Sequence, residues 1–249
     1  MAVPEYVILL VIAVTMFVAI SVTALITVGV LRADITAEAR QRFTLQICAT
    51  LALWITAALG LSFSGALIPR ENAFPILGVL IIFGTVAGNL LLFRSATAKS
   101  VLRAVPPHWL ATIQTYRVIG VIFLLLMADG LLPRYFAWTT GWGDILVGVA
   151  APFVGYLLWR DTPRFAPVGL VWCAIGIADL LLVLWKAVRS APGPLQTVIY
   201  DPPTEIIGYF PFPMIPLVIV PISLILHVQL IRALISQAKT TRPLTTRLS

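Results

Sequence analysis

Charged side chains are scarce in this sequence of 249 residues, of which they make up only 11%. A soluble domain carries about 25% Asp, Glu, Lys and Arg, so this chain has too few to cover a surface that faces water. Hydrophobic residues reach 60% instead. The composition therefore excludes an ordinary soluble domain and predicts a protein that folds in a lipid bilayer.

Cysteine and histidine are also rare, with two of each. Cys48 and Cys173 lie inside apolar stretches and are expected to be small buried side chains, not a secreted disulfide framework. The sequence has no glycine-rich phosphate loop, nucleophile elbow or zincin pattern. The N-terminus lacks the basic segment of a cleavable signal peptide. These absences predict an uncleaved N-terminus and favour a membrane protein without a conventional catalytic site.

Long apolar stretches are what the sequence has in abundance. A helix needs about 20 apolar residues to cross the hydrocarbon core of a bilayer. Seven stretches qualify: residues 6–31, 43–62, 75–93, 110–128, 143–159, 168–187 and 209–235. They predict an all-α bundle of seven transmembrane helices within residues 1–236, followed by a basic tail over residues 237–249.

Basic residues concentrate in alternate connections between these stretches and in the tail. They are Arg32, Arg40, Arg42, Arg94, Lys99, Arg103, Arg160, Arg164, Arg232, Lys239, Arg242 and Arg247. Loops rich in Lys and Arg stay in the cytoplasm, so the N-terminus is predicted outside and the C-terminus inside. The same pattern explains the net charge of +7 by contact with the bilayer, without nucleic acid as a partner.

Ionisable side chains within the apolar stretches are candidates for function, because one at the middle of a bilayer costs about 2.5–3.5 kcal/mol to insert. Arg117 lies in the fourth stretch and Asp179 near the middle of the sixth. We expect them to pair, because opposite charges attract strongly in a low dielectric. The pair serves either structure alone or the movement of a solute or proton. Asp144 begins the fifth stretch and is expected to cap that helix near the outer surface.

Further polar side chains fall at a similar depth on several stretches. They are Gln46, Asn89, Gln114 and His227, at the level of Arg117. Lipid offers none of them a hydrogen-bond partner, which predicts either a polar cavity or a network of amides that holds helices together. The predicted substrate-binding residues are Asn89, Gln114, Arg117, Asp179 and His227.

An internal duplication is suggested by matches that keep their order along the chain. The third stretch begins Phe74-Pro75 and ends at Arg94, and the seventh begins Phe212-Pro213 and ends at Arg232. With the same offset, Asn89 coincides with His227. The pattern predicts three helices, an inverting fourth helix and three more, as in parallel repeats of small transporters.

The second half of the chain resembles an uncharacterised family of bacterial seven-helix integral membrane proteins. The residues that carry this resemblance are Gln114 to Arg117, Pro133, Phe136, Ala137, Gly143 to Gly148, Pro221 and His227. The resemblance implies a multi-pass protein of the bacterial inner membrane and no particular activity.

The predicted layout is separately similar to that of SWEET and PQ-loop transporters. This similarity implies that polar residues of the third and seventh helices line a substrate pocket, and the matching positions here are Asn89 and His227. The Pro-Gln pair of those families is absent, and neither the first nor the second stretch has an internal proline as a hinge. The similarity is therefore one of layout.

The sequence favours a small transporter or permease for a small polar or anionic solute, with proton coupling through Arg117 and Asp179. One alternative is a redox subunit, with His108 and His227 as axial ligands of a haem or, with the two cysteines, as ligands of a soft metal. Another is a non-catalytic subunit or sensor that binds a partner protein or forms an oligomer. The seventh stretch has no lysine for retinal, which argues against a photoreceptor.

Overall fold

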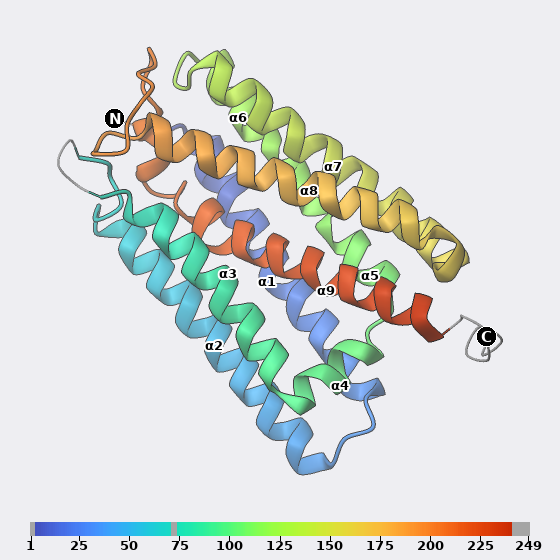
Figure 1. Cartoon of the computed structure of the whole chain (residues 1–249). Coiled ribbons are helices and arrows are strands. Elements are labelled where there is room, and N and C mark those ends of the chain that lie inside the picture. The colour runs from blue at the N-terminus through green and yellow to red at the C-terminus, as the bar shows by residue number, and fades with distance from the viewer. Residues whose placement is uncertain (1–2, 71–73, 241–249) are drawn as a thin grey trace.

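The computed structural model describes residues 3–70 and 74–240, and every regular element in these ranges is a helix (Figure 1). Seven helical spans in this part of the chain are long and apolar enough to cross a membrane. The predicted number of spans is thus confirmed. The chain has the architecture of a multi-pass membrane protein.

Among the described residues, five spans are single helices and two are compound. The single helices are α1 (Glu5–Arg32), α2 (Ala37–Phe63), α3 (Ile76–Arg94), α7 (Arg134–Arg160) and α8 (Thr162–Ser190). The fourth span joins α5 (Pro107–Thr112), the 3₁₀ segment η1 (Ile113–Gly120) and α6 (Val121–Ala128). The seventh joins the π-helical segment η3 (Ile215–Ile219) to α9 (Val220–Thr240). Two short helices, α4 (Ala96–Ala104) and η2 (Thr204–Gly208), lie in connections.

The starts of several spans differ from those predicted, and that of α7 differs most. The seventh begins at Ile215 instead of residue 209, and α7 begins at Arg134 instead of residue 143. The start of α7 was missed because its first turns hold tyrosine, tryptophan and threonine, which lower the hydropathy but suit a membrane interface. As a result Asp144 lies well inside α7, and its expected role as a helix cap near the surface is wrong.

The ends of the chain are only partly described. α9 continues through the beginning of the predicted tail to Thr240, and residues 241–249 of that tail lie outside the described residues. Residues 1–2 and 71–73 lie outside them as well. The orientation of the termini and the internal duplication both stay predictions.

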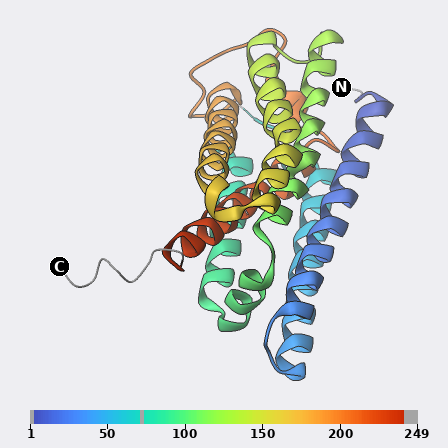
Figure 2. The same cartoon turned by 90° about the vertical axis from the view of Figure 1, so that its right-hand side faces the viewer.

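The seventh span lies at the centre of the bundle (Figures 1 and 2). α9 packs against α3, α5 and α8, while η3 contacts α1, α2 and α3; α7 packs along the whole fourth span. Of the most apolar window of each span, 56% is buried in the fourth and seventh but only 6% in α2. The fourth and seventh spans therefore form the core, and α2 lies at the rim.

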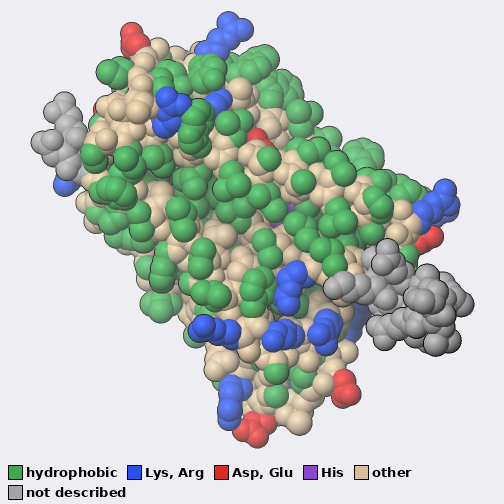
Figure 3. Space-filling view, viewed as in Figure 1, with side chains coloured by type: hydrophobic (Ala, Val, Ile, Leu, Met, Phe, Trp, Pro, Cys, Tyr) green, Lys and Arg blue, Asp and Glu red, His purple; other side chains and the backbone are tan. Residues whose placement is uncertain are grey.

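The outer surface has the composition that lipid requires. Figure 3 shows hydrophobic side chains over most of one face, with Lys and Arg toward its two ends. Cys48 is exposed on this apolar exterior, contrary to the expectation of a buried side chain, because it lies on the outer face of α2. Cys173 is buried as expected.

A tryptophan side chain ties α2 to the seventh span. Pro221 has no backbone N–H, so it cannot donate to the carbonyl of Leu217 four residues earlier. The indole Nε1 of Trp54 donates a hydrogen bond of 2.7 Å to that carbonyl. A Cβ at Gly84 of α3 would lie 2.8 Å from Cζ2 of the indole, so this glycine leaves room for the ring. The side chain of Trp54 thus compensates for the proline.

Trp54→Phe should lower the free energy of unfolding by about 1 kcal/mol, because it removes the indole donor to the carbonyl of Leu217. The loss should shrink in a Pro221→Ala background, where a backbone N–H is restored four residues after that carbonyl. Unfolding in mixed micelles measures the double-mutant cycle, with the exposed Trp159→Phe as a control. Equal losses in both backgrounds would contradict this compensation.

Candidate functional site

Arg117 is the central side chain of the candidate site and is only 1% exposed. Its Nε donates a hydrogen bond of 2.8 Å to Oδ1 of Asp144 from α7. Its Nη2 donates one of 2.5 Å to Oδ2 of Asp179 from α8. The contact between Arg117 and Asp179 predicted from the sequence is confirmed. Asp144 is a second carboxylate on the same guanidinium, and we call these three residues the charged cluster.

The remaining side of the guanidinium faces α8 and the seventh span. Nη1 of Arg117 donates to the carbonyl of Gly176 at 3.3 Å and lies 3.3 Å from Nε2 of His227. A guanidinium only donates hydrogen bonds, so Nε2 accepts, and a neutral ring carries its proton on Nδ1. That Nδ1 is buried and has no hydrogen-bond partner among the described residues. The ring of Trp172 packs 4.9 Å from the histidine ring.

Glycines bring the helices close enough for these contacts. A Cβ at Gly143 of α7 would overlap the carboxylate of Asp179, and one at Gly176 would overlap the ring of His227. A Cβ at Gly148 would lie 2.6 Å from the backbone nitrogen of Val118 in the fourth span. Small residues allow membrane helices to approach one another closely. These glycines therefore leave the space that the charged cluster and His227 occupy.

The 3₁₀ segment sets which side chains share a face with Arg117. Residues three apart eclipse one another in a 3₁₀ helix, so Gln114 lies one turn from Arg117 on the same face. Gln114 is fully buried, and neither of its amide atoms has a hydrogen-bond partner among the described residues. Because a buried amide without a partner is costly, this position is suited to a polar guest such as water.

The irregular segments of the fourth and seventh spans are linked to each other. The hydroxyl groups of Tyr116 and Ser223 are 2.8 Å apart, and Ser223 also donates to the carbonyl of Ile219 at 2.8 Å. Ile219 ends the π-helical segment, and Tyr116 lies in the 3₁₀ segment. Such departures from α geometry often mark hinges or functional sites. The 3₁₀ segment contains Arg117 itself, and the π-helical segment ends eight residues before His227, which contacts Arg117.

Two of the predicted polar residues do not join the charged cluster. Asn89 of α3 accepts a hydrogen bond of 3.1 Å from Gln229 and belongs to a separate network. Gln46 is exposed on α2. Their depth was estimated from the sequence, but the face of the helix on which each lies was not: Gln46 faces outward, and Asn89 faces Gln229 instead of Arg117.

The structure does not bring the two histidines to one metal. His108 lies at the start of α5, nine residues and about 13 Å along the span from Arg117, whereas His227 contacts Arg117 directly. Two nitrogens on one metal lie about 4 Å apart. Among the described residues there is also no group of three His, Cys, Asp or Glu that could hold a metal ion. The geometry thus gives no support to the haem or metal alternative.

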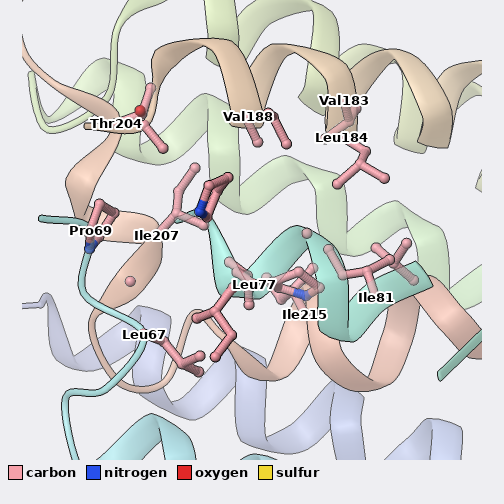
Figure 4. Close-up of a pocket in the computed structure, with 18 of the residues that line it drawn as sticks. Leu67, Pro69, Leu77, Ile81, Val183, Leu184, Val188, Thr204, Ile207 and Ile215 are labelled. Carbon is pink, nitrogen blue, oxygen red and sulfur yellow. The ribbon is translucent and has the colours of Figure 1, made fainter. Parts of the chain in front are cut away.

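An apolar cavity of about 160 Å³ lies beside the charged cluster (Figure 4). Its wall comes from α3, α8, the start of the seventh span and the adjacent connections. Figure 4 labels Leu67, Pro69, Leu77, Ile81, Val183, Leu184, Val188, Thr204, Ile207 and Ile215 around it. The wall also includes the exposed Arg70 and, from the charged cluster, Asp144. The cavity therefore gives an apolar guest access to a buried carboxylate.

Arg117→Met should strongly destabilise the fold, by about 3–5 kcal/mol, because it leaves two buried carboxylates without their counter-charge. The triple variant Arg117→Met/Asp144→Asn/Asp179→Asn should recover much of this loss. The midpoint of thermal unfolding in detergent measures both, and the exposed Arg160→Met is the matched control. If Arg117→Met unfolds at the same temperature as this control, the charged cluster does not hold the helices together.

A comparison with known protein families covers the whole charged cluster. The model of a domain of unknown function, DUF8737, matches residues 73–235, which run from α3 through most of α9. No curated protein and no solved structure matches the chain significantly. Since the match spans well over half of its length, the chain belongs to the DUF8737 family.

Proposed function

We propose that this protein is a membrane transporter that exchanges protons for small, mainly apolar solutes carrying a positive charge. The observation that carries the proposal is that Asp144 belongs both to the wall of the apolar cavity and to the charged cluster. A single carboxylate is thus available to a guest in the cavity and is coupled to a second carboxylate through Arg117.

The balance of charge favours a cation as the guest. With both carboxylates ionised, the charged cluster carries one more negative than positive charge. The next cation along α8, Lys186, is seven residues and about 10 Å from Asp179, and it donates to Thr139. The sequence favours a polar or anionic solute, but because both carboxylates compensate Arg117 we propose a cationic one. A proton or another cation would complete the neutralisation that a buried cluster requires.

The cavity wall indicates the size and polarity of the solute. Apart from the two charged residues, its wall is mainly aliphatic and aromatic. An engineered apolar cavity of about 150 Å³ holds benzene, which is close to the volume here. A solute with one ring or a short branched chain and one cationic group matches both the wall and the carboxylate.

Proton coupling follows from competition for the same carboxylates. A proton bound to the charged cluster brings its charge to zero and removes the attraction for the cationic solute. In the orientation that the basic loops predict, the cavity lies on the outer side and the buried amide of Gln114 on the cytoplasmic side of Arg117. Gln114 and Nδ1 of His227 then provide polar atoms for the inner part of a proton path.

Gly78→Leu should block the cavity. Gly78 lies in its wall, where an added Cβ would be 3.3 Å from Val188 and 3.7 Å from Leu184. A leucine also favours the helix more than glycine does. In proteoliposomes with an acidic lumen, uptake of radiolabelled benzyltrimethylammonium should fall by about tenfold, equivalent to about 1.4 kcal/mol.

Gly60→Leu is the matched control, since a Cβ there has nothing within 4 Å. It should take up the probe at the unmodified rate. Equal uptake by the two glycine variants, or no uptake of the probe above that of empty liposomes by the unmodified protein, would contradict the proposed transport.

Asp144→Asn should abolish the exchange while preserving the fold. The variant still pairs Arg117 with Asp179, but the charged cluster becomes neutral and no longer attracts a cation. Addition of the same probe should raise the pH of an acidic lumen for the unmodified protein, because protons leave as the cation enters. A lumenal pH dye should report no rise for Asp144→Asn, and the usual rise for Asp129→Asn, an exposed carboxylate that bonds to Tyr6. A full pH rise with Asp144→Asn would refute the coupling.

A further inference from the structure

A second polar network, outside the charged cluster, runs from the interior of the bundle to its surface. Asn89 and Gln229 are 8% and 4% exposed. Nδ2 of Asn89 donates to the carbonyl of Thr85 at 3.0 Å, and its Oδ1 accepts from Nε2 of Gln229 at 3.1 Å. Oε1 of Gln229 then accepts from Nη1 of Arg232 at 3.1 Å. Two buried amides therefore hold an exposed guanidinium.

Arg232 is held from a second side as well. Its Cζ lies 4.2 Å from the centre of the Phe93 ring, the stacking geometry of a cation–π contact. A guanidinium has five N–H donors, and no carboxylate of the described residues lies within salt-bridge distance of this one. Arg232 is thus fixed in place with donors left for an anion from outside the protein.

Other basic residues gather at the same end of the bundle. Arg94 ends α3, and Lys99 and Arg103 lie on α4 away from its buried residues Ala98 and Val101. Figure 3 shows a group of Lys and Arg side chains at the lower end of this face, over α4 and the ends of α3 and α9. α4 is too short to cross a bilayer. A short basic amphipathic helix is typical of the membrane interface.

Exposed leucines adjoin this basic surface. Leu90 and Leu91, in the last turns of α3, are 44% and 59% exposed. Apolar surface toward the middle of the bundle and basic residues toward its end match the two parts of a phospholipid, the acyl chains and the charged head group. A free phosphate ion would use only the basic part.

We infer that Arg232, together with Arg94 and Lys99, binds the phosphate of an anionic phospholipid, and that Asn89 and Gln229 position the guanidinium for it. Bidentate hydrogen bonding to a phosphate is the particular strength of arginine. The proposal gives Asn89 a role that the charged cluster does not, and it is independent of the transport function.

The test compares lipid binding by two variants. One removes the charge of Arg232, and the other removes only the Asn89 amide that positions it through Gln229. The full-length protein, purified in detergent, is incubated with equal amounts of phosphatidylglycerol and phosphatidylcholine, and the bound lipids are counted by native mass spectrometry. The unmodified protein should retain phosphatidylglycerol preferentially. Arg232→Gln should lower that preference on the order of fivefold, the size expected for one basic residue that contacts an anionic head group directly. Asn89→Leu keeps every charge and should lower it by a smaller factor.

Two control variants test whether loss of any amide or any basic residue has the same effect on lipid binding. Gln46→Leu removes an exposed amide of α2, and Arg164→Gln removes an exposed charge at the start of α8; both should retain the full preference. An unchanged preference in Arg232→Gln would overturn the site. A preference lost in Arg232→Gln but intact in folded Asn89→Leu would overturn the positioning role. Displacement of the lipid by inorganic phosphate at millimolar concentration would show that the site takes free phosphate instead.

Discussion

The structure depends on one buried guanidinium. Arg117 is almost fully enclosed and binds two carboxylates, a backbone carbonyl and an imidazole nitrogen. Its removal from water is compensated only if those partners come within hydrogen-bond distance. This requirement fixes where the fourth span, α7, α8 and the seventh span meet, and it explains glycines at positions where any Cβ would overlap a member of the cluster.

The two spans at the centre depart from regular α-helix beside this cluster. The 3₁₀ segment turns Gln114 and Arg117 to the same side. In the seventh span, a π-helical segment is followed by Pro221, which has no N–H to donate to the carbonyl of Leu217. Trp54 donates a hydrogen bond to that carbonyl instead. The Tyr116–Ser223 hydrogen bond connects both segments. A movement of one span would therefore displace the other, which is what the proposed transport requires of the helices around the charged cluster.

The seven spans and the Arg117–Asp179 contact could be predicted from the sequence, because lipid forces apolar stretches into helices and brings unlike charges together. The depth of Asp144 could not be predicted, since the first turns of α7 are rich in aromatic residues and their nine residues were not recognised as helix. The prediction from the sequence also misplaced Asn89. Hydropathy gives the depth of a side chain in the bilayer but not the direction in which it points, and Asn89 has the right depth on a face directed at Gln229.

A purely structural role for the charged cluster would need only one carboxylate. A second ionisable group within the membrane costs about 2.5–3.5 kcal/mol on insertion scales, and here that group lies in the wall of a cavity. Asp179 alone would neutralise Arg117. The presence of Asp144 is explained if its excess charge is the part of the cluster that a proton or a cationic guest can occupy in turn. The stoichiometry of the charges, more than the number of helices, is the argument for transport.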